Sequence, residues 1–313
     1  MSNPRTGDLL IEAEEFDDYG GWVLDSQFDT EMGSPYLLAH GSGQPVKDAC
    51  TVVHIEEPGS YSVWVRAKDW VPAHHPGRFE LSLGNIRLAT EFGANGKDWS
   101  WQSAGNIGLE AGPLKVTLHD LTGFDGRCDA IFLSRDGAAP IDGTSSDARA
   151  WRRRLRGIPD EPTPEGPFDL VIVGGGVTGS VGALVAARLG LRVAVVQNRP
   201  VLGGNASIEI GIGPRGEKGA TVAEAIARTP DGDLQVGRLL ESEPGATVFL
   251  HHQVFNVTMD GEAIESVDAR EAISGREIRI SGSQFIDCTG TAILGMLAGA
   301  PTMFGIEGAE EDG

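Results

Sequence analysis

Three glycines occur at a spacing that suits phosphate binding. The segment FDLVIVGGGVTGS (168–180) contains Gly174, Gly176 and Gly179. In this pattern the first glycine allows a tight turn, the second lets a pyrophosphate approach the backbone, and the third lets a helix pack closely on a strand. Val177 and Thr178 fall in the first helical turn, where free N–H groups and the helix dipole attract phosphate oxygens. The spacing therefore predicts a dinucleotide-binding loop.

A neutral residue occupies the sequence position whose side chain usually binds the ribose of the cofactor. Gln197 lies 23 residues after Gly174, where an Asp or Glu normally accepts hydrogen bonds from both ribose hydroxyls. The Gln amide offers one carbonyl acceptor and one NH₂ donor. We therefore expect affinity to fall roughly tenfold, the difference between a charged and a neutral hydrogen bond. Asn198 and Arg199 follow directly and complete this part of the predicted cofactor-binding set.

The elements around the loop follow the order strand, helix, strand. An apolar run predicts a buried strand over 168–173, and the apolar face formed by Val177, Val181, Leu184 and Val185 predicts a helix over 177–189. Gly190 suits the left-handed residue that ends the helix. A second strand is predicted over 191–196. This order indicates an α/β domain with a parallel sheet.

A second glycine pair connects this half of the chain to a known family. With the motif RPVLGGNAS at 199–207, residues 167–305 resemble the FAD-dependent oxidoreductases of the glutathione-reductase-like superfamily, and more closely a bacterial branch that carries this motif. The resemblance implies FAD as the cofactor and a Rossmann-type FAD-binding domain with a β-meander over 246–287 that turns at Asp260-Gly261 and Ser274-Gly275. It also implies further cofactor contacts at Gly203, Gly204, Asn205, Val254, Thr289 and Gly290.

This chain departs from the family in two respects. Thr291-Ala292 replaces the Asp-Gly that usually follows Cys-Thr-Gly, which removes an acidic side chain near the cofactor. Family members also continue through a substrate domain and a closing segment of the FAD domain. We therefore expect an incomplete FAD domain, with the substrate domain supplied by a separate chain or a missing segment. No residue is identifiable as a catalytic base.

The amino-terminal part has the rhythm of short strands. Runs such as YSVWVRA (61–67) and LKVTLHD (114–120), separated by turn signals, predict an antiparallel jelly-roll-like β-sandwich. We assign 1–140 to the sandwich, 141–166 to a linker with a short helix around Trp151, and 167–313 to the FAD-binding domain. The basic run RAWRRRLR (149–156) is interpreted as a solvated part of the linker.

The sandwich resembles carbohydrate-binding modules through LLIEAEEFDDYGGWVLD (9–25) and EPGSYSVWVRAKDW (57–70). In related modules an early acidic pair and a late Asp hold a structural calcium ion, and Glu12, Glu14 and Asp129 are the counterparts. Oxygen ligands suit Ca²⁺, although solvated carboxylates are the more common outcome, so the primary prediction is no metal. Trp99 and Trp101 are the best candidates for a sugar-stacking pair, against the alternative that they are buried in the core.

Composition narrows the possible partners. The chain has 25 Lys and Arg against 45 Asp and Glu, a formal net charge of −20, which disfavours nucleic acid because phosphate neutralisation needs a basic face. A signal peptide and an 18-residue apolar stretch are both absent from the sequence, so we expect a cytoplasmic protein without a membrane contact. The three cysteines are far apart, which disfavours a disulfide framework and a zinc site.

The leading hypothesis is an FAD-dependent oxidoreductase, or the amino-terminal part of one, that transfers a hydride between flavin and an organic substrate such as a carbohydrate derivative. The first alternative is a non-catalytic protein that binds a glycan or a partner and carries a degenerate dinucleotide fold. The second is an NAD-dependent dehydrogenase that uses the same glycine loop. The Leu-Gly-Gly segment at 202–204 and the meander favour FAD over NAD.

Overall fold

The computed structural model describes residues 7–28, 32, 34–301 and 303. The chain divides into two compact units, Met1–Asp160 and Glu161–Gly313. Within the described residues no helix is both long and apolar enough to cross a bilayer.

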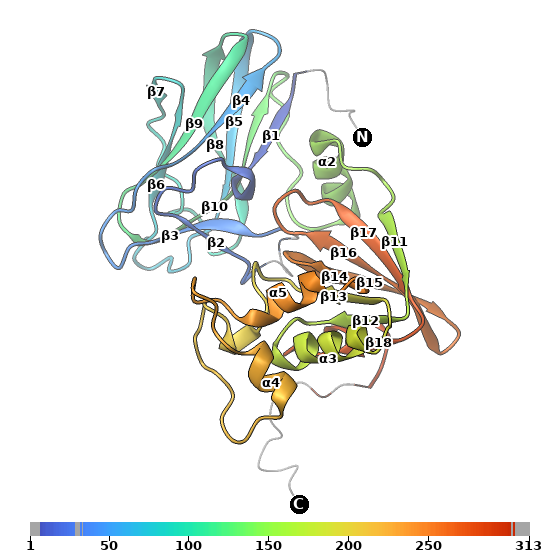
Figure 1. Ribbon diagram of the computed structural model, residues 1–313. Coiled ribbons are helices and arrows are strands. Elements are labelled where there is room, and N and C mark those ends of the chain that lie inside the picture. Colours follow the sequence, from blue (N-terminus) through green and yellow to red (C-terminus); the bar gives the residue numbers. More distant parts are fainter. Residues whose placement is uncertain (1–6, 29–31, 33, 302, 304–313) are drawn as a thin grey trace, which may run out of the picture. The chain divides into compact units, whose positions relative to one another are not determined.

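The first unit is a sandwich of two antiparallel sheets, as the sequence predicts (Figure 1). One sheet has the order β2-β3-β10-β5-β8, with β1 paired to β10, and the other has the order β4-β9-β6-β7. The strands are β1 (Leu9–Glu12), β2 (Val23–Asp25), β3 (Tyr36–His40), β4 (Ala49–Ile55), β5 (Gly59–Ala67), β6 (Phe79–Leu83), β7 (Ile86–Arg87), β8 (Ser100–Leu109), β9 (Gly112–Asp120) and β10 (Phe124–Ser134). A short 3₁₀ helix, η1 (Ala13–Glu15), follows β1.

Alternation along β5 accounts for the core of the sandwich. Tyr61, Val63 and Val65 are at most 1% exposed and face the opposite sheet, because successive side chains of a strand point to opposite faces. Trp64 and Arg66 lie on the other face of β5. That outer face is also covered, because Arg66 is buried and Trp64 is partly buried.

The predicted linker, residues 141–166, does not form a separate segment between the two units. Helix α2 (Ser146–Arg156) belongs to the first unit, and Trp151 is 7% exposed because it packs against Phe132 at a ring-centroid distance of 5.0 Å. The Ser145 hydroxyl caps α2 by accepting a hydrogen bond from the N–H of Ala148, and Gly157 ends the helix at φ +63. The helix around Trp151 is therefore confirmed, but it packs on the sandwich, and the boundary between the units falls after Asp160.

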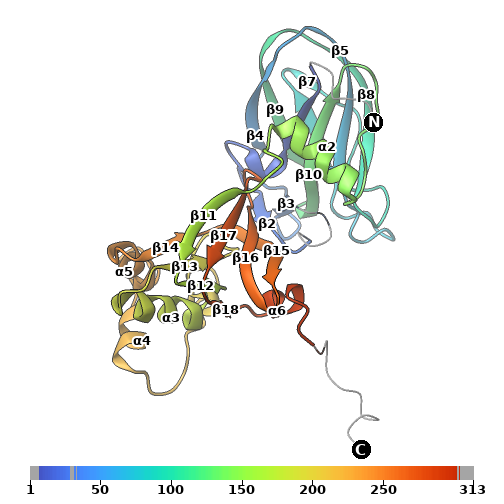
Figure 2. The same cartoon turned by 90° about the vertical axis from the view of Figure 1, so that its right-hand side faces the viewer.

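The second unit contains a parallel sheet in the order β14-β13-β12-β18 (Figure 2). Its strands are β12 (Leu170–Val173), β13 (Val193–Val196), β14 (Ala246–Phe249) and β18 (Phe285–Asp287). Helix α3 (Val177–Arg188) connects β12 to β13, so both the predicted helix and the α/β order are confirmed. On α3, Leu184 is buried, whereas Val185, which was expected on the same face, is 41% exposed. The remaining helices are η2 (Gly204–Ala206), α4 (Ala220–Ala225), α5 (Gln235–Ser242) and α6 (Ile293–Leu297).

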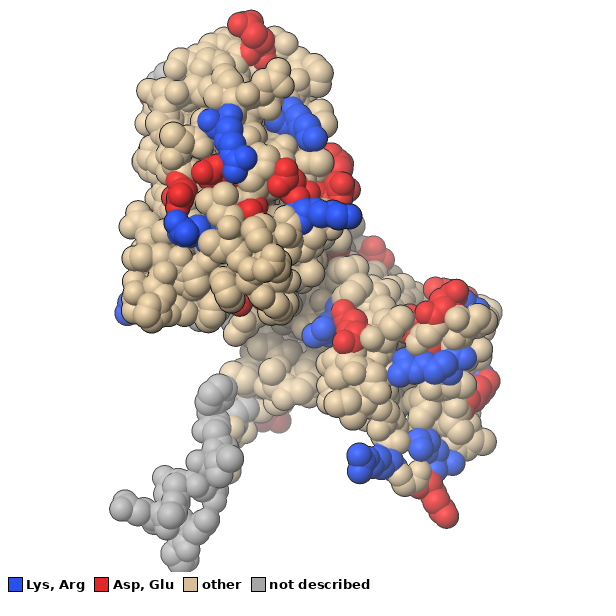
Figure 3. All heavy atoms as spheres, turned by 90° about the vertical axis from the view of Figure 1, so that its left-hand side faces the viewer, with Lys and Arg blue, Asp and Glu red and all other residues tan. Residues whose placement is uncertain are grey.

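A second sheet in this unit contains the expected meander. Strands β15 (His252–Asp260), β16 (Ala263–Glu271) and β17 (Glu277–Gly282) are antiparallel neighbours, and β11 (Thr163–Phe168) pairs with β17 in parallel. The turns fall at Gly261 and Gly275, with φ of +62 and +65. The meander is shorter than 246–287, because Ala246–Phe249 forms β14 and Phe285–Asp287 forms β18 of the parallel sheet. On the face of the first unit seen in Figure 3, acidic and basic side chains are interspersed.

Candidate functional site

The residues predicted to bind a dinucleotide come together at one edge of the parallel sheet. Gly174 follows β12, Gln197 follows β13, and Thr289 lies two residues beyond β18. These three strands are parallel neighbours in the sheet. Their carboxyl ends therefore lie side by side, at the edge where open α/β sheets bind ligands.

The three loop glycines have different packing requirements. Gly174 has φ +101, and a Cβ there would lie 2.6 Å from the carbonyl of Cys288. A Cβ on Gly179 would lie 1.9 Å from the Gly174 carbonyl oxygen. Gly176 has an ordinary φ of −63, and no atom lies within 4 Å of the place its Cβ would occupy. The outer two glycines are thus required by packing, whereas the space beside Gly176 is open.

The second glycine pair lies directly against this loop. Gly203 forms a parallel bridge with Gly176, and its N–H donates to the carbonyl oxygen of Gly175 at 2.7 Å. A Cβ on Gly204 would lie 3.3 Å from the Cα of Gly176. Asn205 follows with an exposed side chain. Two motifs that are distant in sequence therefore form one surface.

Gln197 has a structural role that the sequence did not indicate. Its side chain is 4% exposed, its Oε1 accepts a hydrogen bond from the N–H of Gly175 at 2.8 Å, and its Nε2 donates to the carbonyl of Val201 at 3.2 Å. The amide thus links the glycine loop to the segment that follows β13. Asn198 and Arg199 are exposed, and Arg199 Nε donates to Glu209 Oε2 at 2.5 Å.

The turn after β18 depends on Asp287, which sequence reasoning missed. Asp287 Oδ1 accepts hydrogen bonds from the N–H of Thr289 at 2.9 Å and from its hydroxyl at 2.6 Å, while Oδ2 accepts from the N–H of Leu294 at 2.9 Å. Burial alone would raise the pKa of Asp287, but these hydrogen bonds outweigh it and lower the pKa. The Asp-x-Thr spacing at the end of a strand could have indicated this turn.

The remaining predicted contacts lie beside this edge. Gly290 is exposed with open space around it. Val254 is 3% exposed on β15, the edge strand of the second sheet, where it pairs with Ala269. Ala292, which replaces the glycine of the family pattern, has φ +53 and precedes α6. A left-handed conformation favours glycine, so this departure leaves local backbone strain.

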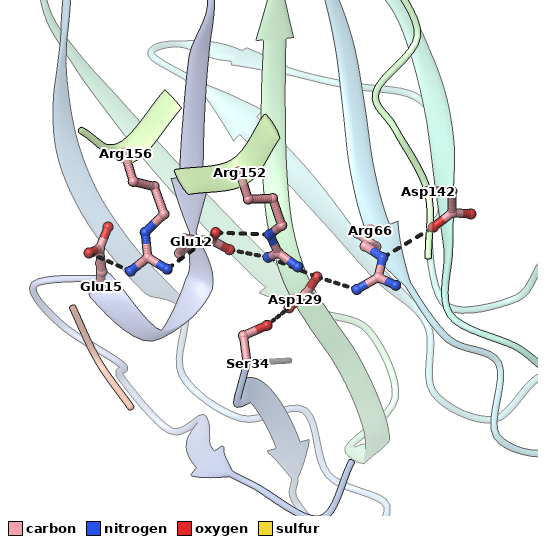
Figure 4. Close-up of polar contacts among 8 residues, drawn as sticks. All are labelled: Glu12, Glu15, Ser34, Arg66, Asp129, Asp142, Arg152 and Arg156. Carbon is pink, nitrogen blue, oxygen red and sulfur yellow. Dashed lines mark hydrogen bonds and ion pairs between the residues drawn. The ribbon is translucent and has the colours of Figure 1, made fainter. Parts of the chain in front are cut away.

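In the first unit, the three acidic residues considered as calcium ligands do come together. Glu12 and Asp129 are fully buried, Glu14 is 1% exposed, and one carboxylate oxygen from each lies within 4.8 Å of the others. The same space contains guanidinium groups (Figure 4). Arg152 donates from Nε to Glu12 Oε1 at 3.1 Å and from Nη2 to Glu12 Oε2 and to Asp129 Oδ2, the last at 3.2 Å.

Two further arginines contact this cluster. Arg66 Nη1 lies 3.0 Å from Asp129 Oδ2, and Arg156 Nη1 lies 3.5 Å from Glu12 Oε1. Burial would raise the pKa of Asp129, but Arg152 and Arg66 lower it overall. Burial, followed by the charge of Glu12, raises the pKa of Glu14 well above its usual range. By ligand type the carboxylates suit Ca²⁺, but with the arginines in place the pocket does not fit a metal ion.

Of the two alternatives for Trp99 and Trp101, the structure supports packing in the interior over an exposed stacking pair. Trp99 is 9% exposed and packs against Tyr36 at a centroid distance of 4.9 Å. Trp101 lies on β8 and is partly buried, 6.1 Å from Trp151 of α2. The sequence of the segment 97–102 indicates a loop, but the segment leads into strand β8, and helix α2 packs against Trp101. Both rings therefore contribute to packing.

A comparison with family models bears on the second unit. Residues 169–231 and 217–313 match the model of the family described as FAD dependent oxidoreductase. The second unit is therefore similar to this family over nearly its whole length. FAD is its cofactor, and the predicted resemblance to FAD-dependent oxidoreductases agrees with this match.

The chain has likenesses among solved structures, and it spans about half the length of the mannanase among them. A GH26-CBM35 β-(1,4)-mannanase from Podospora anserina is 17% identical, with a TM-score of 0.35 over 63% of this chain and 52% of that one. The C-terminal CBM6 module of a Zobellia galactanivorans laminarinase is 18% identical, with a TM-score of 0.31 over 41% of this chain and 98% of that one. The FAD-complexed glycerol-3-phosphate dehydrogenase from Bacillus halodurans is 15% identical, with a TM-score of 0.31. That match covers 43% of this chain and 37% of the dehydrogenase.

The geometry of the sheet edge fits FAD. The open space beside Gly176 and the N-terminus of α3 provide what a pyrophosphate needs, because the first N–H groups of a helix have no partner within the helix. The exposed Thr178 side chain borders the same turn. The glycine segment at 203–204 forms a second wall of this space.

Proposed function

We propose that FAD lies across the carboxyl edge of the parallel sheet and that the protein transfers a hydride between this flavin and an organic substrate. The observation that carries the proposal is the meeting of the Gly174–Gly179 loop, the Gly203-Gly204 segment and the Thr289 turn at one edge, with open space beside Gly176. FAD supplies the redox chemistry, and the protein supplies orientation and electrostatics.

Each group of residues has a distinct role in this proposal. The N–H groups of Val177 and Thr178 hold the pyrophosphate, and the Gly203-Gly204 segment closes over it. The ribose side is formed by Asn198 and Arg199, with Gln197 fixing the loop from behind, and Asn205 borders the pyrophosphate. The adenine meets the backbone of Val254. Thr289 and Gly290 approach the dinucleotide from the turn that Asp287 organises.

We further propose a carbohydrate derivative as the substrate, because a carbohydrate-binding-module-like sandwich is joined to the flavin domain. The substrate domain comes from a separate chain or a further segment. One observation supports a covering polypeptide near the flavin. Ile208, Ile210 and Ile212, which follow the Gly203-Gly204 segment, are 54%, 46% and 67% exposed, an unusual run of large apolar side chains for a surface loop.

The test is reconstitution with cofactor. Purified protein is incubated with excess FAD or NAD, passed through a desalting column, and examined for a visible flavin spectrum and a thermal shift. The proposal predicts retained FAD, no retained NAD, and bleaching of the flavin when an oxidisable sugar derivative is added without oxygen. Absence of both the spectrum and the thermal shift would refute cofactor binding, whereas retained FAD without bleaching by any substrate would refute only the redox role.

A non-catalytic glycan-binding role is the second candidate, favoured by one exposed aromatic pair. Trp70 is 39% exposed and donates its Nε1 hydrogen to the carbonyl of Phe124, itself 51% exposed, while Arg127 lies over the Trp70 ring. Exposed aromatic faces can stack on sugar rings. Glycan-array binding that is lost in Trp70→Ala, without cofactor retention, would select this role.

A further inference from the structure

The acidic pocket of the sandwich contains three buried carboxylates that require positive charge. Burying an unpaired carboxylate costs several kcal/mol, and Glu12, Glu14 and Asp129 lie in mutual contact range with exposed fractions of 0%, 1% and 0%. Such a group of oxygen ligands suits a divalent cation. The structure supplies guanidinium groups at this position.

Arg152 uses the lone pairs that a metal would need. Its guanidinium spans both oxygens of Glu12 and reaches Asp129 Oδ2 (Figure 4). The same Asp129 oxygen also accepts from Arg66 at 3.0 Å, while Oδ1 accepts from the Ser34 hydroxyl at 2.8 Å. A metal ion cannot coordinate Glu12 and Asp129 while these hydrogen bonds exist.

Charge also opposes joint occupancy. Three arginines, Arg66, Arg152 and Arg156, contact the pocket. Arg66 also pairs with Asp142, and Arg156 also pairs with Glu15. A divalent ion added to this set would face three cations at close range in a buried environment, where Coulomb energies are large. A divalent metal ion and the arginine side chains are therefore alternative partners for these carboxylates.

Glu14 marks the part of the pocket that the arginines leave unused. Among the described residues neither Oε1 nor Oε2 of Glu14 has a hydrogen-bond partner, although an oxygen of Glu14 lies within 4.8 Å of those of Glu12 and Asp129. Buried polar atoms are rarely left without a partner. This unpartnered side chain is the ligand that a metal would use and Arg152 does not reach.

Two of these arginines, Arg152 and Arg156, come from helix α2, which is also fixed on the sandwich by apolar contacts. Arg152 and Arg156 are one turn apart and so share a face of α2. Trp151 packs 5.0 Å from Phe132 and 6.1 Å from Trp101, with perpendicular rings at the second contact. The position of the two guanidinium groups is therefore linked to the docking of the whole helix.

We propose that Arg152 of α2 replaces a divalent cation in the Glu12–Glu14–Asp129 pocket, so that docking of α2 and binding of a metal ion there are mutually exclusive. The wild-type sandwich is then independent of metal. Removing the guanidinium uncovers a site that binds Ca²⁺ through the three carboxylates.

The test compares the wild type with Arg152→Ala, using Arg154→Ala as the control, because Arg154 is an exposed residue of the same helix. Thermal unfolding of the full chain is followed in chelator and in millimolar CaCl₂. We expect no calcium shift for the wild type or for Arg154→Ala. Arg152→Ala should unfold at a lower temperature in chelator, and calcium should raise its Tm by several degrees in a saturable manner.

Two further variants identify the ligands. Glu14→Gln added to Arg152→Ala should abolish the calcium response, and Arg152→Lys, which keeps a cation in the pocket, should show none. If Arg152→Ala does not fold in chelator, refolding into calcium is measured, and recovery there supports the proposal. A calcium-dependent Tm in the wild type, or no calcium effect on Arg152→Ala under either protocol, would overturn it.

Discussion

The carbonyl oxygen of the Gln197 side chain accepts a hydrogen bond from the backbone N–H of Gly175 at 2.8 Å. The same amide donates to the carbonyl of Val201 at 3.2 Å, and the side chain is 4% exposed. The residue expected to contact the ribose therefore also holds the glycine loop in place. This role exists before any cofactor binds.

Gln197→Leu should destabilise the cofactor-free protein. Leucine has a similar size but leaves the buried N–H of Gly175 and the carbonyl of Val201 without partners, which costs about 1–3 kcal/mol. Urea unfolding in the absence of FAD measures this loss. If Gln197 served only to bind the ribose, the free energy of unfolding would be unchanged and only FAD affinity would fall.

Gly176 and Gly179 should respond to substitution in opposite ways. Gly176→Val meets no protein atom within 4 Å of its Cβ, so the Tm of the cofactor-free protein should change little while FAD retention is lost. Gly179→Ala would place its Cβ 1.9 Å from the Gly174 carbonyl oxygen and should lower the Tm sharply. Gly182→Ala, on the exposed side of α3, is the control and should leave FAD retention intact. Retention of FAD by Gly176→Val would contradict the proposed pyrophosphate position.

Ala292→Gly should stabilise the second unit. Ala292 has φ +53, a conformation that costs a residue with a Cβ about 1 kcal/mol, and glycine avoids this cost. The expected gain in unfolding free energy is of that size, reduced by the greater backbone entropy of glycine when unfolded. Ala298→Gly is the matched comparison, because Ala298 has an ordinary φ of −77 and should lose stability. A loss of stability in both variants would contradict the strain at Ala292.

The second unit should lose stability in acid partly through Asp287. Hydrogen bonds from Thr289 and α6 lower the pKa of Asp287 in the folded state despite its burial. The charged form is therefore favoured by folding, and this contribution is present above the unfolded pKa of about 3.9 and disappears as the pH falls through the lower folded value. Asp287→Asn should reduce the fall in Tm below about pH 4. Glu262→Gln, in an exposed turn, should leave the Tm–pH curve unchanged.

Individual helices, strands and loops could be predicted from the sequence more accurately than the strands and side chains with which they pair. The glycine loop, α3 and the β-sandwich follow from spacing and alternation, which act over a few residues. Assigning Ala246–Phe249 to the meander failed because a short apolar strand fits either sheet, and pairing with β13 is a long-range choice. The arginines of α2 were expected in solvent because their partners, Glu12 and Asp129, lie 140 and 23 residues away from Arg152.

The pairing of β11 with β17 places the entry of the chain into the second unit within a sheet. Thr163–Phe168 pairs with β17 in parallel and forms the outermost strand of the meander sheet. A polypeptide cut at residue 167, where sequence alone would begin the domain, would lack this strand and expose the unpaired backbone of β17. Open edges of this kind promote aggregation. The domain should therefore be produced from Glu161 onward, so that β11 covers the edge of β17.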